Sequence, residues 1–200
     1  MDVKNAIEKR RAYRSLESIE VSDALIEDLA ESARLAPSCF NKQPWRYVFV
    51  RDKEQLEKLH KSLSTTNKWV ELSSLIIAAF SDVKNDCVIK ERQYYLFDTG
   101  LASGFIMLRA TELGLVAHPI AGFNEDGAKR VLGIPEHMRL ISLIVIGKRS
   151  KEFKEGLTDI QKSKEDKRPE RKQFKEFIFI DEFTKPFNKS KGESHRRKQK

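Results

Sequence analysis

The sequence has few cysteines, and they are not spaced to bind a metal. Cys39 and Cys87 are the only two in 200 residues, and their wide separation excludes the close pairs of zinc and iron–sulfur sites. The four histidines form no HxH or HxxxH pair. We therefore expect no metal, and we expect both cysteines to be reduced, as in a cytoplasmic protein.

Long apolar runs are also lacking. No window approaches the roughly 18 consecutive apolar residues of a transmembrane helix. The N-terminal stretch MDVKNAIEKRRAYRSL has no apolar core of the kind found in secretory signals. These absences predict a cytoplasmic protein without membrane contact, and the length of 200 residues with 34% charged residues predicts one folded domain.

The positive charge is concentrated at the C-terminal end. Residues 185–200 carry seven Lys or Arg and one Glu, so that only +2 of the net charge of +8 belongs to residues 1–184. We interpret residues 1–184 as the folded domain and residues 185–200 as a basic, disordered tail. A solvated end is the simpler interpretation of this tail, and contact with nucleic acid or another anionic partner is the alternative.

Helical and strand patterns alternate along the chain. Amphipathic spacing predicts three helices, in EVSDALIEDLAESARLA with Ser22 as N-cap, in residues 52–63 with Asp52 as cap, and in FNEDGAKRVLGI with Asn124 as cap. Apolar runs predict strands at 45–50, 75–80 and 140–147, and a further strand in KEFIFIDEF. The interleaving predicts a mixed α/β or α+β domain.

The longest periodic segment, residues 96–115, predicts a helix that is apolar around most of its circumference. Gly100, Ala102, Ser103 and Gly104 leave part of its surface small. A helix of this kind is buried, either in the centre of the domain or against a second subunit.

Two segments in the first quarter of the chain could bind a ligand. Arg10, Arg11 and Arg14 lie near the N-terminus, and on a helix positions 10 and 14 would share a face and could meet one anion; a solvated basic face is the alternative. The loop APSCFNKQPW, residues 36–45, is rich in donors and acceptors and is stiffened by two prolines. It could match the edge of a flavin ring, or it could simply end the preceding helix.

Two later segments add to this set. AHPIAGF, residues 117–123, supplies Pro119 and Gly122 where the backbone would turn closely against a neighbour. KRPERK contains Arg171 and Lys172, a further candidate anion site.

In order and spacing these segments resemble the nitroreductase family of FMN-dependent oxidoreductases. The resemblance rests on the Arg-Arg-x-x-Arg opening, the A-P-S-x-x-N-x-Q-P-W loop, an Asn before a buried strand, the P-I-x-G-F turn and the late Arg-Lys pair, and it extends from about Val3 to about Phe183. It implies an α+β fold, a three-layer α-β-α sandwich with a central, mostly antiparallel sheet. It also implies a domain-swapped homodimer in which FIFI is exchanged between subunits and FMN binds at the interface.

The resemblance further assigns cofactor contacts to individual residues. Five basic residues would bind the FMN phosphate: Arg10, Arg11, Arg14, Arg171 and Lys172. Four loop residues would lie against the flavin of the partner subunit: Pro37, Ser38, Cys39 and Asn41. The side-chain amide of Asn67 would hydrogen-bond the ring. The turn formed by Ile120, Ala121 and Gly122 would bring a backbone N–H to flavin N5.

The implied activity is transfer of a hydride from NADH or NADPH through FMN to a small acceptor, such as a nitroaromatic or a quinone, by ping-pong turnover. No catalytic side chain is expected, because the cofactor carries the redox chemistry. Ala121 stands where some nitroreductases carry glutamate, a difference that bears on the acceptor. The alternatives are dehalogenation, flavin fragmentation or heterocycle oxidation on the same scaffold, an FMN-binding protein with little turnover, or a nucleic-acid-binding module.

Overall fold

The computed structural model describes residues 1–152 and 157–187 and divides the chain into two compact units, residues 1–166 and residues 167–200. Most of the predicted basic tail, residues 188–200, lies outside the described residues. The predicted domain boundary after residue 184 therefore stays a prediction.

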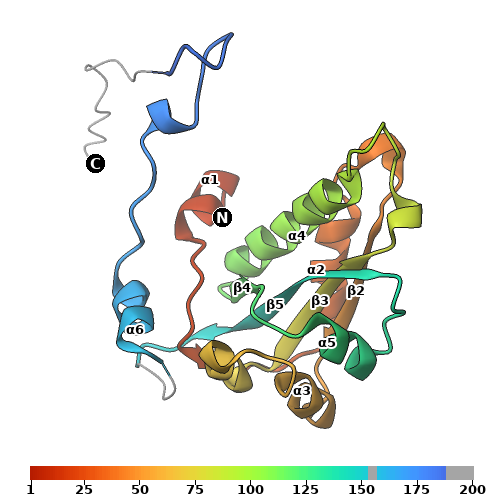
Figure 1. Ribbon diagram of the computed structural model, residues 1–200. Helices are drawn as coiled ribbons and strands as arrows, with labels where there is room; N and C mark the ends of the chain where they lie inside the picture. The colour runs from red at the N-terminus through yellow and green to blue at the C-terminus, as the bar shows by residue number, and fades with distance from the viewer. Residues whose placement is uncertain (153–156, 188–200) are drawn as a thin grey trace. The chain divides into compact units, whose positions relative to one another are not determined.

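The first unit is an α+β sandwich with helices on both faces of one sheet (Figure 1). Its strands are β1 (Leu16–Glu17), β2 (Trp45–Val50), β3 (Leu75–Ser81), β4 (Val116–Ile120) and β5 (Arg139–Arg149). Its α-helices are α1 (Val3–Lys9), α2 (Asp23–Arg34), α3 (Lys53–His60), α4 (Tyr94–Glu112), α5 (Glu125–Leu132) and α6 (Asp159–Asp166). Three short 3-10 helices are η1 (Cys39–Asn41), η2 (Thr65–Leu72) and η3 (Val83–Asn85).

The sheet is antiparallel in every described pairing. Its strand order is β1-β5-β3-β2, and β4 pairs with β5 as well, along residues 143–147. Trp45 and Arg139 both lie opposite Ser81 at one end of the sheet, whereas Leu16 pairs with Arg149 at the far end of β5. The predicted α+β fold with a mostly antiparallel sheet is confirmed.

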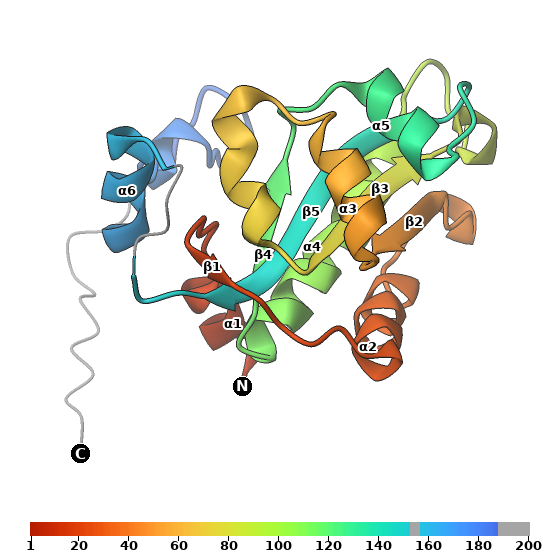
Figure 2. The same cartoon turned by 90° about the horizontal axis from the view of Figure 1, so that it is seen from below.

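Alternation along β3 builds a core on each face of the sheet, because successive strand residues point to opposite sides. Ile76 and Ala78 belong to the core that α3, α5 and η2 cover, and Leu75 and Ile77 belong to the core that α2 and α4 cover. Figure 2, a view from below, shows α3 and α5 in front of the sheet and α4 behind it. This is the expected three-layer arrangement.

The three predicted N-caps are confirmed. The side chains of Ser22, Asp52 and Asn124 each accept a hydrogen bond from the backbone N–H three residues further along. Such bonds satisfy donors that the first helical turn leaves without a partner. They explain why α2, α3 and α5 begin where the sequence indicated.

The predicted helical arrangement of the N-terminal arginines is wrong. Helix α1 ends at Lys9, and Arg10 is already its C-cap with φ −56° and ψ 121°. The chain then runs without helix into β1, where Leu16 pairs with Arg149. Since pairing with β5 requires an extended approach, residues 10 and 14 do not share a helical face.

Helix α4 is buried along one side only. Ala102, Ile106 and Ala110 are fully buried in the core of the first unit. Phe97 and Phe105 are 63% and 39% exposed on the other side. A Cβ built on Gly100 or Gly104, on the same exposed side, meets no atom within 4 Å. In one chain, therefore, half of this apolar helix is uncovered.

The predicted strand in KEFIFIDEF is also wrong. The described part of the second unit contains a 3-10 helix, η4 (Phe174–Glu176), and a turn closed by an isolated bridge between Phe179 and Pro186. The N–H of Ile180 donates to the carbonyl of Lys185, and that of Phe187 donates to Ile178. These bonds close a turn within the segment, where the sequence had predicted a strand.

Candidate functional site

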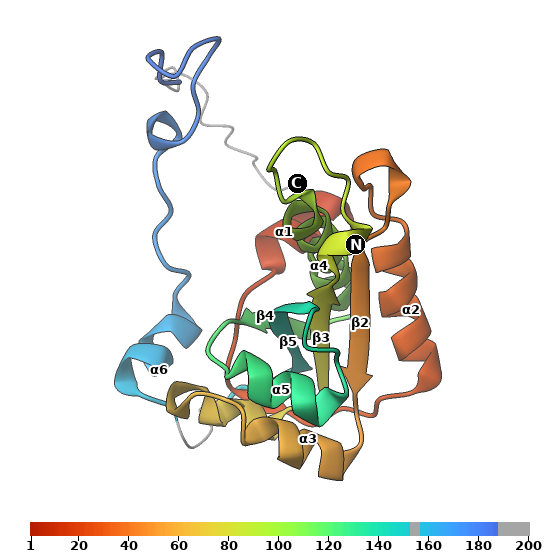
Figure 3. The ribbon, with the colours of Figure 1, turned by 45° about the vertical axis from the view of Figure 1, so that its right-hand side comes forward.

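The predicted site residues of the first unit fall into two groups separated by the width of the sheet, because the 120–122 turn follows β4, which pairs with β5, whereas the 36–45 loop leads into β2, which pairs with β3. One group, here called the arginine–turn cluster, comprises residues 10–14, Asn67 and residues 120–122. The other is the 36–45 loop, which precedes β2 at the end where Trp45 pairs with Ser81. Figure 3 shows this loop near the upper end of the first unit and η2, which carries Asn67, at its lower end. One chain therefore does not bring the two groups together.

A buried carboxylate holds the arginine segment in place. Glu165 of α6 is 3% exposed, and its carboxylate accepts hydrogen bonds from the N–H groups of Arg14 at 2.8 Å and Ser15 at 3.3 Å. The guanidinium of Arg11 donates to the carbonyls of Lys164 at 2.7 Å and Asp166 at 3.2 Å, at the C-terminal end of the same helix. Arg11 therefore anchors the C-terminal end of α6 to the arginine segment, a role that its sequence motif did not indicate.

The neighbourhood of Arg14 is positively charged and half-buried. Burial lowers the pKa of the Arg14 guanidinium, and Glu165 partly opposes this effect. The pKa of His118 is lowered to about 4, mainly by burial, with the charges of Arg14 and Arg10 acting in the same direction and the hydrogen bond to Tyr13 opposing them. Positive groups in a partly desolvated place suit an anion such as a phosphate.

Asn67 lies against the 120–122 turn. Its Nδ2 donates to the carbonyl of Gly122 at 3.0 Å, and its Oδ1 accepts from Nε1 of Trp69 at 3.3 Å. The same Gly122 carbonyl accepts from the N–H of Ser64 at 3.0 Å. A Cβ on Gly122 would come within 2.7 Å of both Asn67 Nδ2 and Ser64 Oγ. The turn therefore needs glycine for close approach.

Two residues that sequence reasoning missed join this turn to the arginine segment. The ring of His118 stacks on that of Trp69, with centroids 4.6 Å apart, and the guanidinium carbon of Arg14 lies 5.9 Å from the Trp69 ring centroid. His118 Nδ1 is 3.0 Å from the carbonyl of Tyr13, so Nδ1 must carry the proton because a carbonyl only accepts. His118 stands in AHPIAGF, but the pattern of that segment indicates only Pro119 and Gly122, and no local pattern pairs His118 with Trp69.

The 36–45 loop holds an unusual backbone. Phe40, Asn41 and Gln43 have φ angles of 48°, 53° and 47°, in the left-handed region that costs energy for residues other than glycine. Ser38 Oγ accepts from the N–H of Gln43 at 2.9 Å and so closes the loop. Phe40, which lies in this loop, is 80% exposed. Such strain is found where a loop serves function more than stability.

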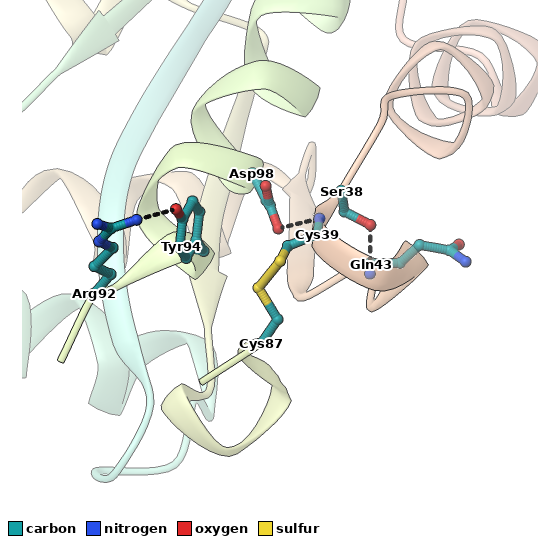
Figure 4. The surroundings of a disulfide bond; sticks show 7 residues. All are labelled: Ser38, Cys39, Gln43, Cys87, Arg92, Tyr94 and Asp98. Atoms are coloured by element: carbon teal, nitrogen blue, oxygen red, sulfur yellow. Dashed lines mark hydrogen bonds between the residues drawn. A yellow bond between two sulfur atoms is a disulfide. The ribbon is translucent and has the colours of Figure 1, made fainter. Parts of the chain in front are cut away.

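The expectation that the cysteines are reduced is wrong for this structure. Cys39 and Cys87 form a disulfide with Cα atoms 5.9 Å apart (Figure 4). The N–H of Cys39 also donates to the buried carboxylate of Asp98 at 3.0 Å. The sequence separation of 48 residues hid the pair, because the contact depends on how β3 and α4 bring two loops to the same end of the sheet.

Two of the predicted phosphate contacts lie outside the first unit. Arg171 and Lys172 belong to the second unit, and their part in an anion site stays a prediction. A hollow of about 820 Å³ lies beside α3, lined by Ser18, Arg51, His60 and Ser74 among others. It contains none of the predicted cofactor contacts.

Two further observations concern the described ranges, 1–152 and 157–187. No three His, Cys, Asp or Glu side chains there are grouped so that they could hold a metal ion. No helix within these ranges is long and apolar enough to cross a membrane.

Comparison with known proteins points to one family. A sequence model described as "Nitroreductase family" matches residues 7–71 and 74–148. A "Putative NADH dehydrogenase/NAD(P)H nitroreductase" of Methanothermobacter thermautotrophicus is 31% identical over 152 residues, which cover 74% of this chain and 77% of that protein. An "Iodotyrosine deiodinase" of Haliscomenobacter hydrossis is 25% identical over 171 residues, covering 70% and 76%. A solved "oxidoreductase containing FMN" has a TM-score of 0.79 at 24% identity and covers 92% and 93% of the two chains.

Proposed function

The chain belongs to the nitroreductase family, and on that premise we propose that it is an oxidoreductase that binds FMN and uses NADH or NADPH to reduce a small electron acceptor. The observation that carries the proposal is a chain of contacts that leads from the turn to the arginine segment. Asn67 hydrogen-bonds both Gly122 and Trp69, and the Arg14 guanidinium lies over the Trp69 ring. FMN is elongated, with a flat ring at one end and a phosphate at the other. The chain of contacts offers uncharged hydrogen-bonding groups at one end and arginine at the other.

The residues present fit this cofactor. Arg10 and Arg14 would bind the phosphate, which needs several charged donors. Asn67 would use the second hydrogen of Nδ2 toward the ring, since its first is taken by Gly122. The backbone N–H groups of Ala121 and Gly122 would face the ring in a turn that Ser64 and Asn67 hold fixed. When bound, FMN supplies the hydride chemistry, and the protein supplies binding and orientation.

We expect a homodimer with FMN at the interface. The 36–45 loop and the arginine–turn cluster are separated by the width of the sheet, with β5 and β3 between β4 and β2, so a second copy is needed if both contact one flavin. The exposed side of α4, with Phe97, Gly100, Gly104 and Phe105, is a suitable surface for that copy. Exposed aromatics of the second unit, including Phe177 and Phe183, would be covered in the same assembly.

The acceptor distinguishes the leading proposal from its alternative. A nitroaromatic or a quinone is the acceptor in the leading proposal, in line with the printed name of the archaeal relative. Reductive dehalogenation is the second candidate, because relatives include proteins named iodotyrosine deiodinase. Both reactions use the same FMN scaffold.

The test is a visible absorption spectrum of the purified protein followed by anaerobic titration with NADH and then NADPH. The proposal expects about one FMN per chain, bleached by at least one nucleotide and reoxidised by nitroaromatic or quinone, with iodotyrosine as the competing acceptor. Bound FMN that neither nucleotide reduces would instead indicate a flavin-binding protein with little turnover. A protein that cannot take up FMN at all would overturn the proposal.

A further inference from the structure

The Cys39–Cys87 disulfide joins two segments that have few other links. Cys39 begins η1 in the 36–45 loop, and Cys87 lies in the segment 82–92, between β3 and α4. Under the proposed function, on which any effect on the cofactor rests, the first segment lies against the flavin. The disulfide attaches the second segment to the first (Figure 4).

Apart from this bond, the segment is held mostly by itself. Asp82 Oδ1 accepts from the N–H of Lys84, and the backbone N–H groups of Asn85 and Asp86 donate to residues 82 and 83. An isolated bridge pairs Ile89 with Arg92. Outside these local bonds, the described structure gives a contact between His137 Nε2 and Asp82 Oδ2 at 3.3 Å and a hydrogen bond from Arg92 to Tyr94 at 3.2 Å.

One buried oxygen in the segment lacks a partner within the described residues. Asp86 is 8% exposed, and its Oδ1 accepts no hydrogen bond there. A buried carboxylate oxygen without a partner opposes burial. The residue next to Cys87 therefore favours release of the segment, while the disulfide holds it in place.

The two cysteine residues differ in exposure. Cys87 is 4% exposed, whereas Cys39 is only partly buried, beside the exposed Phe40. Thiol–disulfide exchange requires that an attacking thiolate reach one sulfur in line with the bond that breaks. The geometry makes Cys39 the sulfur that is attacked and Cys87 the leaving thiolate.

We propose that Cys39–Cys87 is a site of thiol–disulfide exchange with a dithiol reductant, and that its reduction releases segment 82–92 from the 36–45 loop. A thiolate of the reductant bonds to Cys39 Sγ, and Cys87 leaves as a thiolate and takes up a proton. The second thiol of the reductant then displaces Cys39. Two electrons have passed to the protein, both cysteines are thiols, and the reductant has become a cyclic disulfide.

The first experiment uses the full-length protein and does not depend on flavin. Air-oxidised and dithiothreitol-treated samples are alkylated under native conditions and weighed by mass spectrometry, and parallel samples are digested with trypsin. Release of the segment should speed cleavage after Lys84, Lys90 and Arg92, all exposed, by about tenfold, as expected when local opening becomes easier. Cys87→Ser should be cleaved at the fast rate with or without dithiothreitol.

A matched variant keeps the bond and alters the same segment. Val88 is 79% exposed, and Val88→Ser should still change from slow to fast cleavage when dithiothreitol is added. Free thiols in the air-oxidised protein, a bond that dithiothreitol reduces only after denaturation, or equal cleavage rates in both states would overturn the proposal. Because neither readout involves FMN, failure of the proposed function leaves these results interpretable.

A second measurement addresses the consequence for the flavin. In FMN-loaded protein, the KM for the acceptor is compared between oxidised and reduced states and with Cys87→Ser. A change in KM that is absent from Cys87→Ser supports control of access to the site. Faster cleavage with an unchanged KM would overturn that part and confine the exchange to the mobility of the segment.

Discussion

The imidazole of His118 stacks on the indole of Trp69, with ring centroids 4.6 Å apart and planes inclined by 28°. His118 also donates to the carbonyl of Tyr13, and Trp69 donates to Asn67. Three segments that are remote in sequence, around residues 13, 69 and 118, are thus joined by one aromatic contact. The ring pair is the point where the arginine segment meets the 120–122 turn.

Acid should weaken the fold through His118. Burial lowers its pKa in the folded protein to about 4 from the ordinary 6.5, so the unfolded chain binds the proton first as the pH falls. The contribution of neutral His118 is complete above pH 6.5 and is lost as the pH falls toward 4. The total loss is about 3 kcal/mol of unfolding free energy. Urea unfolding at pH 7, 6, 5 and 4 measures it.

The control for that titration is His118→Gln, which keeps an N–H donor and cannot titrate in this range. Its free energy of unfolding should start lower than wild type at pH 7 and fall less steeply between pH 6.5 and pH 5. Equal slopes in the two proteins would assign the acid sensitivity to other groups.

Arg14 and Arg11 should have separable roles. Arg14→Ala should weaken FMN about tenfold or more, because a charge-assisted contact to the phosphate is lost, and should leave riboflavin binding nearly unchanged. Arg11→Ala should cost about 1 kcal/mol of stability, because its hydrogen bonds go to the carbonyls of Lys164 and Asp166. Fluorescence titration with both flavins and urea unfolding measure the two effects.

Arg130→Ala on α5 controls for the change in net charge. A larger loss of FMN affinity in Arg11→Ala than in Arg14→Ala would reverse the assignment.

Gly122→Ala should damage the site more than the fold. Its Cβ would lie 2.7 Å from Asn67 Nδ2, so the amide must move, while repacking of a flexible side chain costs only about 1 kcal/mol. FMN affinity should fall in Gly122→Ala and in Asn67→Ala. The double variant should bind FMN no more weakly than the single variant that shows the larger loss. Additive losses in this cycle would show that the glycine acts independently of Asn67.

Gly104→Arg should prevent dimerisation without unfolding the chain. A Cβ at this position meets nothing within 4 Å in one chain, so an arginine side chain can extend outward unless a second copy packs there. Sedimentation velocity should show a dimer for wild type and a monomer for Gly104→Arg, with far-UV circular dichroism unchanged. Glu54→Arg, on α3 across the sheet, should remain dimeric. A Gly104→Arg dimer would exclude this side of α4 as the interface.

Local sequence signals predicted the elements of the first unit well. Ser22, Asp52 and Asn124 cap the helices they were assigned to, because capping depends on residues three apart. The fully apolar run in β3 identified a strand buried on both faces. Signals of this kind need no knowledge of the rest of the fold.

Predictions failed where distant partners decide the outcome. The arginine segment is extended because Leu16 pairs with Arg149 and Glu165 accepts its N–H groups, and neither partner is near in sequence. Cys39 and Cys87 are joined for the same reason. The motif residues of the site were identifiable from their order, but Trp69, His118 and Glu165, which position them, carry no local pattern.

The seven residues of β3 are all buried, between β2 on one side and β5 on the other. Its amide protons can therefore exchange with solvent only when the whole first unit opens, whereas those of the 36–45 loop and segment 82–92 can exchange through small local openings. In deuterium exchange the two classes should differ by orders of magnitude in rate. Under the proposed function, binding and release of FMN would need only such local openings and would not require the first unit to unfold.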